Sequence, residues 1–261
     1  MNDPWANAIE YETFMGHWST LIAKEFLDWL SIPDESIWLD VGCGTGTLTK
    51  LILEKFKPKE IIALDQSPDF ISYLQNLDDT KKINFKVGLA ESMEVDTNTI
   101  DAVVSGLVLN FVQDPKAAAA EMLRATRPGG KVGVFVWDYA KGMQMLRYFW
   151  DAAVELDIKA SEFDEGLRFP ICNKGHLESI FKEVGFKHVE EKAIEVKTIF
   201  KSFNDYWQPF LSNVGPAPGY VMNLNVENRK KLEAKLRNSL PINKDGTISL
   251  SAKAWAVKGI V

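Results

Sequence analysis

The sequence predicts an α/β protein with a doubly wound, mostly parallel sheet of seven strands and helical cap insertions. Two observations lead to this fold class. In the first half of the chain, short apolar segments typical of buried strands alternate with segments whose apolar residues recur at helical spacing. A glycine-rich loop, Gly42-Cys43-Gly44-Thr45-Gly46, lies between the first of these strands and the helix that follows. Glycines in this place let the backbone turn tightly and approach a ligand closely.

The first half of the chain begins with an amphipathic helix, expected at 18–30. Five strands are expected to follow, at 36–41, 60–65, 83–87, 101–109 and 131–137. The helices between them are expected at 48–56, from Ser67-Pro68 and from Asp114-Pro115, since Ser or Asp before Pro is typical of a helix N-terminus. Pro128-Gly129-Gly130 predicts a turn before the fifth strand. This alternation favours right-handed crossovers and a sheet that helices cover on both faces.

The regular alternation of strands and helices ends after Trp137. Helices are expected at 143–156 and 174–184, and the last two strands at 188–199 and 248–257, the final one antiparallel. Two further helices are expected within 202–240, around a Gly/Pro-rich connection at 213–220.

We therefore expect one structural domain. Residues 1–137 hold an N-terminal helical segment and the cofactor-binding core, and 138–261 hold the rest of the sheet with cap insertions at about 138–173 and 201–245. Both insertions follow the carboxyl ends of strands, where doubly wound sheets bind their ligands. They are expected to roof the cofactor and build the acceptor pocket.

Composition narrows the functional class. Hydrophobic residues make up 46% and charged residues 25%, as in an ordinary globular protein, and the formal net charge of -6 disfavours a nucleic-acid partner. Two cysteines and three histidines show no zinc-ligand spacing, so no metal is expected. No apolar run predicts a membrane span, and the acidic residues 1–12 do not resemble a signal peptide. We expect a cytoplasmic protein.

The glycine loop and a downstream acid point to a nucleotide-type cofactor. The second strand ends in Asp65, about 20 residues after the loop, where doubly wound folds place a ribose-binding acid. Two cofactor classes compete. The nicotinamide pattern G-x-G-x-x-G requires glycine at position 47, which is Thr47. The third glycine comes one residue sooner, and Asp40 precedes the loop; this spacing favours S-adenosylmethionine.

Five motifs give the chain a resemblance to the class I, Rossmann-like S-adenosylmethionine-dependent methyltransferases. It is specifically similar to the type-11 group, which includes ubiquinone and menaquinone methyltransferase-like enzymes. The motifs are LDVGCGTG at 39–46, ALDQSP at 63–68, GLAESM at 88–93, DAVVSGLVLNFVQD at 101–114 and RPGGK at 127–131. They cover roughly 38–137 in the family's order and are specific for fold and cofactor rather than for substrate.

The resemblance implies which residues hold the cofactor. The glycine loop and Asp40 are expected around the methionine portion, Asp65 at the ribose, the 89–91 segment at the adenine, and the end of the fourth strand near the transferred methyl. The full expected set is Tyr11, Asp40, Gly42, Cys43, Gly44, Asp65, Gln66, Ala90, Glu91, Ser105, Gly106 and Leu107. Leu89 stands where the family commonly has Asp, so a side-chain contact to the adenine amine is not expected there.

Fewer sequence features indicate where the methyl acceptor binds. The segment 11–19 is similar to one that folds over the cofactor in relatives, with His17 where Arg is usual. The candidates for contact with the acceptor are His17, Asn110, Tyr139, Tyr206, Trp207 and Phe210. No residue pattern identifies a catalytic base.

The sequence thus predicts a methyltransferase that uses S-adenosylmethionine and acts on a small-molecule acceptor. Two alternatives belong to other classes: a non-catalytic S-adenosylmethionine-binding regulatory protein, and a nicotinamide-dependent oxidoreductase, which the early third glycine disfavours. Neither the acceptor, the methylated atom nor the oligomeric state can be derived from the residues.

Overall fold

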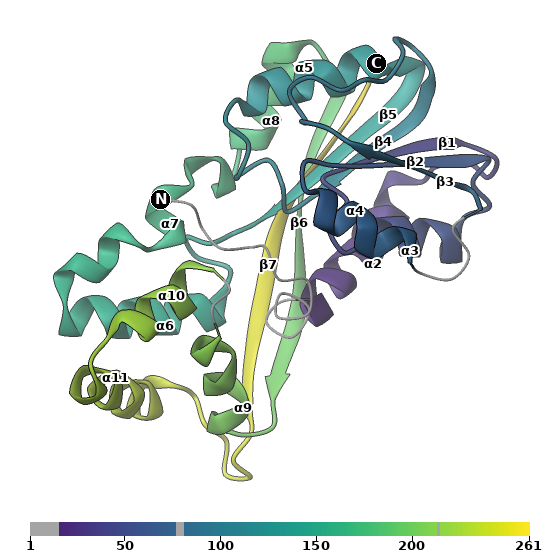
Figure 1. Cartoon of the computed structure of the whole chain (residues 1–261). Coiled ribbons are helices and arrows are strands. Elements are labelled where there is room, and N and C mark those ends of the chain that lie inside the picture. Colours follow the sequence, from purple (N-terminus) through teal and green to yellow (C-terminus); the bar gives the residue numbers. More distant parts are fainter. Residues whose placement is uncertain (1–15, 77–80, 213–214) are drawn as a thin grey trace. The chain divides into compact units, whose positions relative to one another are not determined.

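In the computed structural model, which describes residues 16–76, 81–212 and 215–261, seven strands form one sheet in the order β3-β2-β1-β4-β5-β7-β6 (Figure 1). The strands are β1 (Ile37–Val41), β2 (Glu60–Asp65), β3 (Ile83–Val87), β4 (Ile100–Gly106), β5 (Thr126–Trp137), β6 (Lys187–Phe200) and β7 (Ile248–Ile260). The predicted fold class is therefore confirmed.

Parallel pairing joins the first five strands. Leu39 of β1 pairs with Ile62 of β2 on one side and with Val103 of β4 on the other. The chain winds outward from β1 in both directions, so the order of the strands reverses between β1 and β4. In open α/β sheets, ligands bind beyond the carboxyl ends of the strands at such a switch point.

The last strand runs antiparallel to β5, as the sequence predicts. The amide of Val261 donates to the Gly130 carbonyl near the start of β5, at 3.1 Å, and the amide of Asp138, directly after β5, donates to the Lys253 carbonyl at 2.9 Å. Moving forward along β5 thus means moving backward along β7.

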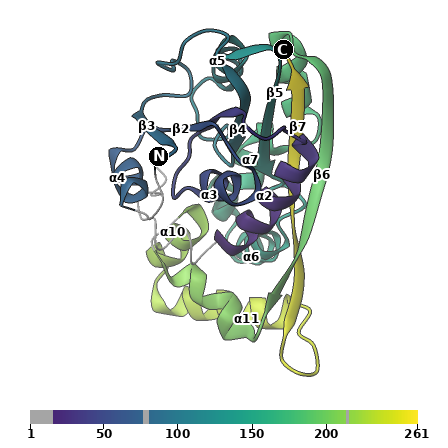
Figure 2. The same ribbon diagram turned by 90° about the vertical axis from the view of Figure 1, so that its right-hand side faces the viewer.

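Helices cover the parallel part of the sheet on both faces. Figures 1 and 2 show α2 (His17–Leu30), α3 (Thr47–Lys55) and α4 (Pro68–Gln75) on one face, while α5 (Pro115–Ala125) and α8 (His176–Val184) pack together on the other. The expected N-caps form: the Ser67 hydroxyl accepts from the Phe70 amide, and the Asp114 carboxylate accepts from the amides of α5's first turn.

The chain divides into two compact units. We call Ser19–Val136, Lys174–Ile194 and Ala254–Val261 the core unit, and Met1–Trp18, Trp137–Asn173 and Glu195–Lys253 the cap unit. The helices of the cap unit are α6 (Gln144–Leu156), α7 (Glu165–Arg168), α9 (Phe203–Trp207), α10 (Pro216–Asn223) and α11 (Val226–Ser239), with 3-10 turns at Ile158–Glu162, Pro170–Cys172 and Gln208–Leu211. No helix in the described residues is long and apolar enough to cross a membrane.

Two local predictions are wrong. The Gly/Pro-rich stretch at 213–220 is helical from Pro216 onward, because proline in a first turn needs no amide partner and its φ suits a helix. The expected turn at 128–130 lies inside β5, which begins at Thr126. There the register with β4 shifts, from Ile100 opposite Thr126 to Ala102 opposite Lys131, and Gly129 at φ +79° accommodates the irregularity.

Candidate cofactor site

The glycine loop links the end of β1 to the start of α3 and lies wholly in the core unit. Gly42 and Gly46 have φ of +72° and +86°, and a Cβ at either would collide with a side chain of Val108 or Leu74, respectively. Gly44 also has a positive φ, +52°, but a Cβ there would meet no atom of the described residues within 4 Å. Two glycines are therefore needed for packing, whereas the third leaves one side of the loop open.

The backbone amides of the loop are engaged within the protein. Those of Gly42 and Cys43 both donate to the Leu64 carbonyl of β2, at 2.7 and 3.0 Å, and that of Gly46 donates to the Cys43 carbonyl at 2.8 Å. These bonds fix the loop against β2. Burial raises the pKa of the Cys43 thiol, so this side chain stays protonated and is not a nucleophile.

Asp65 holds the other side of the loop. It ends β2, is buried, and accepts from the Gly44 amide through Oδ2 and from the Ser67 amide through Oδ1, both at 2.9 Å. Burial raises its pKa above the ordinary value. Each carboxylate oxygen has a further lone pair, so Asp65 can still accept from two ligand hydroxyls.

Asp40 is the second buried carboxyl of the site. It lies on β1, 1% exposed, and its Oδ2 accepts from the Thr49 hydroxyl of α3 at 2.6 Å. Its Oδ1 has no hydrogen-bond partner among the described residues. Burial, to which the charge of Asp65 adds, raises the pKa of Asp40 to about 7. An unpaired buried carboxylate oxygen is suited to a cationic or hydrogen-bond-donating ligand.

The segment 89–91, after β3, combines apolar side chains with one acid that bonds to a neighbouring loop. Leu89 is 51% exposed, while Ala90 is buried. The carboxylate of Glu91 accepts from the Gln113 amide at 3.0 Å, in the loop before α5. Glu91 therefore attaches this segment to that loop. Gln66, directly after Asp65, is exposed.

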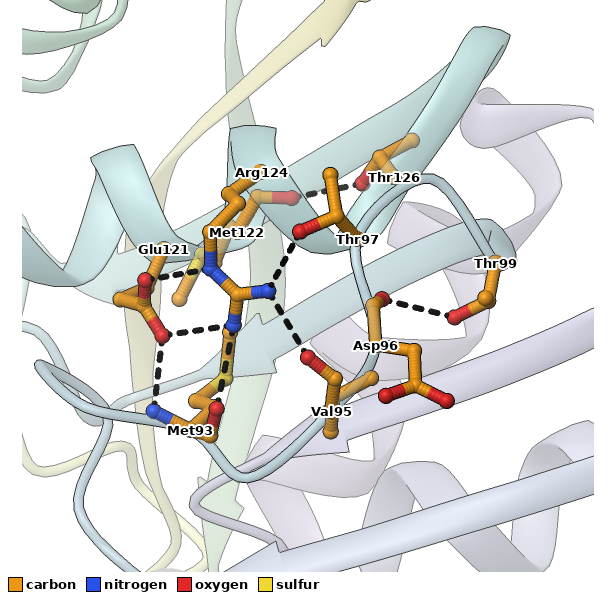
Figure 3. A network of polar contacts seen from close by, with 9 residues as sticks. All are labelled: Met93, Val95, Asp96, Thr97, Thr99, Glu121, Met122, Arg124 and Thr126. Carbon is orange, nitrogen blue, oxygen red and sulfur yellow. Dashed lines mark hydrogen bonds and ion pairs between the residues drawn. The ribbon is translucent and has the colours of Figure 1, made fainter.

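Arg124 of α5 clamps the loop that continues from this segment (Figure 3). Its Nε and Nη2 donate to the two oxygens of Glu121 at 2.6 and 2.9 Å. Nη1 donates to the Val95 carbonyl and the Thr97 hydroxyl, and Nη2 also donates to the Met93 carbonyl, at 2.8 to 3.1 Å. All five N–H groups of the guanidinium are thus used.

We expect Arg124→Met to lower the free energy of unfolding by about 2–3 kcal/mol, because two loop carbonyls lose their Arg124 donors and the Glu121 carboxylate keeps only the Met93 amide among the described residues. Urea denaturation measures this. The control is Lys231→Met, which breaks an exposed pair with Glu227 on α11 and should cost at most about 0.5 kcal/mol. Equal losses in the two variants would show that the clamp contributes no more than a surface ion pair.

The end of β4 carries the remaining expected cofactor residues. The Ser105 hydroxyl is fully buried and donates to the Val41 carbonyl at 2.8 Å, so it joins β4 to β1. A Cβ at Gly106 would lie 2.7 Å from the Phe135 ring, which makes this glycine a packing position. Leu107 has φ +64°, a left-handed backbone that is uncommon without glycine. Such strain often marks functional sites.

The expected acceptor residues fall into different places. Asn110, in the core unit, is 8% exposed. His17 is the exposed first residue of α2, and Tyr139 is buried against Phe169 in the cap unit. Tyr11, which was expected at the cofactor, lies outside the described residues.

Tyr206, Trp207 and Phe210 come together in the interior of the cap unit. Phe210 is fully buried and stacks on Phe149 of α6, with ring centroids 4.5 Å apart. The Tyr206 hydroxyl donates to the Met145 carbonyl at 2.9 Å. Their packing gives all three a structural role, and their contact with an acceptor stays a prediction.

Sequence reasoning missed two residues that shape the site, Thr49 and Arg124. Thr49 gives no signal, since its bond to Asp40 depends on how α3 packs on β1. Arg124 follows Glu121 by three residues on an otherwise alanine-rich helix, a spacing typical of an ion pair. In the described part of the chain, no group of three or more His, Cys, Asp or Glu residues could hold a metal ion.

Known proteins resemble both the sequence and the fold. Residues 39–134 match the type-11 family described as "Methyltransferase domain". An uncharacterized methyltransferase of Mycobacterium tuberculosis is 35% identical over 115 residues, 44% of each chain. The chloroplastic 2-methyl-6-phytyl-1,4-hydroquinone methyltransferase of Arabidopsis thaliana is 30% identical over 184 residues, 70% of this chain and 49% of its own. The chain thus spans half or less of these relatives' length.

A solved structure matches the fold over almost the whole chain. Phosphoethanolamine N-methyltransferase 2 of Haemonchus contortus, in complex with S-adenosyl-L-methionine, has a TM-score of 0.60 at 16% identity, and the match covers 97% of this chain and 56% of that one. Family match, relatives and fold agree. Through its core sheet and glycine loop, the chain resembles the class I S-adenosylmethionine-dependent methyltransferases, and residues 39–134 match the type-11 group.

Proposed function

We propose that this protein binds S-adenosyl-L-methionine at the glycine loop and transfers its methyl group to a small-molecule acceptor. The observation that carries the proposal is the pair of buried carboxyls, Asp40 and Asp65, at neighbouring strands on either side of a loop whose central glycine is open. Both carboxyls have raised pKa values, and a cationic ligand would favour their ionised forms.

The residues present fit this cofactor. Asp40 Oδ1, unpaired in the described part of the protein, can accept from the ammonium of the methionine portion. Asp65 can accept from the ribose hydroxyls, and the open side of Gly44 leaves room for the ligand backbone. Leu89, half exposed beside the buried Ala90, offers apolar surface to the adenine.

The same geometry disfavours a nicotinamide dinucleotide. A pyrophosphate needs free backbone amides at the loop, whereas those of Gly42, Cys43, Gly44 and Gly46 already donate within the protein. Two buried carboxyls would also repel its charges.

The bound cofactor would supply a sulfonium methyl that is already reactive. The residues of this chain then have to orient it and exclude water. Asp65 ties Gly44 to the end of β2, and Glu91 and Arg124 hold the neighbouring segment. We propose that the acceptor approaches the methyl group at the end of β4, near Leu107 and Asn110. The names of the Arabidopsis and Haemonchus proteins, a hydroquinone and a phosphoethanolamine methyltransferase, support an acceptor of small size.

Calorimetry with S-adenosylhomocysteine, with NADH as the comparison ligand, tests cofactor choice. Transfer of labelled methyl from S-adenosylmethionine to a panel of phenols, amines and carboxylic acids tests catalysis. Binding of S-adenosylhomocysteine with turnover of one acceptor class supports the proposal. Binding without turnover on any acceptor would favour a regulatory protein, and selective binding of NADH would favour an oxidoreductase.

Replacing Gly44 by valine should abolish most S-adenosylhomocysteine binding while the protein stays folded. The new side chain would project into the open side of the loop and force a residue with φ +52° to be β-branched. Calorimetry gives the affinity and circular dichroism the fold. Unchanged affinity in the folded variant would show that the ligand does not bind on this side of the loop.

Asp65→Ala should weaken S-adenosylhomocysteine binding by about 1.5–3 kcal/mol, at least tenfold, since it removes charge-assisted hydrogen bonds to the ribose. It also releases the Gly44 amide, so a melting curve is recorded beside the calorimetry. Leu89→Ala, at a half-exposed position on the adenine side, should cost much less. Similar losses for both substitutions would argue that Asp65 does not contact the ribose.

A further inference from the structure

Asn110 has a buried amide nitrogen that donates to no other described residue. Its side chain is 8% exposed, and its Nδ2 has no hydrogen-bond partner within the described residues. Leaving a buried donor unpaired is unfavourable, and native proteins rarely tolerate it without reason. The residue lies in a four-residue turn that closes through the Phe111 amide and the Val108 carbonyl, at 2.8 Å.

This turn is fixed beside the glycine loop. The Val108 side chain occupies the space where a Cβ of Gly42 would lie, so the turn covers that glycine. A four-residue turn keeps its Cα atoms within roughly 7 Å of one another, which places Asn110 close to the same loop. The Leu107 amide donates to the Phe135 carbonyl on one side, and Gln113 is bonded to Glu91 on the other.

The turn is therefore held at both ends, and the left-handed Leu107 directly precedes it. Strained backbone and an unpaired buried donor, only three residues apart, are both unfavourable in the free protein. Together they indicate a segment that is pre-organised for a ligand rather than for stability.

Four amides and two acids at the neighbouring loop offer no donor to an anionic ligand group. The amides of Gly42, Cys43, Gly44 and Gly46 donate to protein oxygens, and the buried carboxyls of Asp40 and Asp65 act as acceptors. The carboxylate of an amino-acid tail bound there needs a donor from elsewhere. The Nδ2 of Asn110 is such a donor, buried and already desolvated.

We propose that the Asn110 amide donates a hydrogen bond to the carboxylate of the cofactor's methionine portion, and so acts as a positioning residue for the sulfonium methyl. This inference rests on the proposed function. It assigns the two ends of the amino-acid tail to different side chains: the ammonium to Asp40, on β1, and the carboxylate to Asn110, after β4.

The test compares two ligands that differ in that tail, S-adenosylhomocysteine and 5′-methylthioadenosine. Asn110→Leu, similar in size but without the amide, should weaken S-adenosylhomocysteine about tenfold and leave 5′-methylthioadenosine within twofold of wild type. Asn110→Asp, which brings an acceptor to the carboxylate, should weaken S-adenosylhomocysteine further. The control is Asn84→Leu, at an exposed position of β3, which should change neither affinity.

A second measurement separates this role from a structural one. Because the Asn110 amide nitrogen bonds to no other described residue, ligand-free Asn110→Leu should melt no lower than wild type. A clearly lower melting temperature, an unchanged affinity for S-adenosylhomocysteine, or an equal loss for both ligands would each overturn the inference. If wild type itself does not bind S-adenosylhomocysteine, the proposed function is wrong. If wild type and Asn110→Leu both bind it normally, only the role of Asn110 is wrong.

Discussion

Asp40→Asn should make the ligand-free protein more stable than wild type at pH 8 and, at the same time, weaken its binding of S-adenosylhomocysteine. The carboxyl is buried, with one oxygen bonded to Thr49 and the other unpaired among the described residues, and its pKa is raised from 3.8 to about 7. Asparagine resembles the protonated acid and never carries the unfavourable charge.

The sign of the effect follows from proton binding. Between pH 4 and 7 the folded state keeps the proton on Asp40 while the unfolded state loses it, so the stability of wild type falls as pH rises through this window. A shift of about 3 units corresponds to roughly 4 kcal/mol at pH 8. Asp40→Asn lacks this decline, and the two proteins should be equally stable near pH 4.

Urea denaturation from pH 4 to pH 8 measures the difference. Wild type and variant share other groups, such as the buried Glu165, whose pKa is likewise raised to about 7, so only their difference reports Asp40. Thr49→Val removes the hydroxyl that donates to the Asp40 carboxylate. The fall in stability with rising pH should therefore shift to higher pH. Parallel stability profiles for wild type and Asp40→Asn would contradict the assignment.

The affinity for S-adenosylhomocysteine should depend on pH in the opposite direction to stability. The ammonium of the ligand stabilises the ionised carboxylate, so we expect the affinity of wild type to rise from pH 6 to pH 8, whereas that of Asp40→Asn stays low and nearly flat. Calorimetry at the two pH values measures this. We thus expect Asp40 to lower stability while it strengthens binding, a combination that is common at functional sites.

The succession of strands and helices along the chain and the position of the glycine loop could be predicted because local sequence patterns determine them. Apolar strands, the Ser67-Pro68 and Asp114-Pro115 caps, and the five motifs are all patterns within a few residues. The helix that starts at Pro216 was missed because Gly and Pro were interpreted as a connection, although proline suits a first turn.

The details of the site were harder to predict because they depend on contacts between segments far apart in sequence. Motif comparison marks Ser105 as a cofactor residue, but only the pairing of β4 with β1 shows its hydroxyl bonded to Val41. Likewise, only the packing of the loop against β2 shows that the Gly42 and Cys43 amides donate to Leu64 and the Gly44 amide to Asp65. The unpaired Asn110 amide can be recognised only once burial is known.

Phe210→Ala should lower the free energy of unfolding by about 3–5 kcal/mol, the range for removing a fully buried ring. Phe210 stacks on Phe149 at 4.5 Å, and the rings of Tyr206 and Trp207 lie 5.4 and 5.9 Å from it. The cavity left behind is surrounded by rigid aromatic rings, which cannot collapse into it easily. Phe111→Ala, at a 39% exposed position of the core unit, should cost under about 1 kcal/mol.

The same variants test whether the aromatic residues of the cap unit also contact the acceptor. The carboxyls and the glycine loop lie in the core unit, so Phe210→Ala and Trp207→Ala should bind S-adenosylhomocysteine as wild type does at temperatures where they remain folded. Tyr206→Phe removes the bond to the Met145 carbonyl and should cost about 1 kcal/mol. If Trp207→Ala melts like wild type and yet loses turnover with an acceptor, its ring contacts the acceptor. If stability and turnover fall together, in proportion, the three residues serve to hold α6 and α9 in place, and the acceptor pocket has to be sought elsewhere.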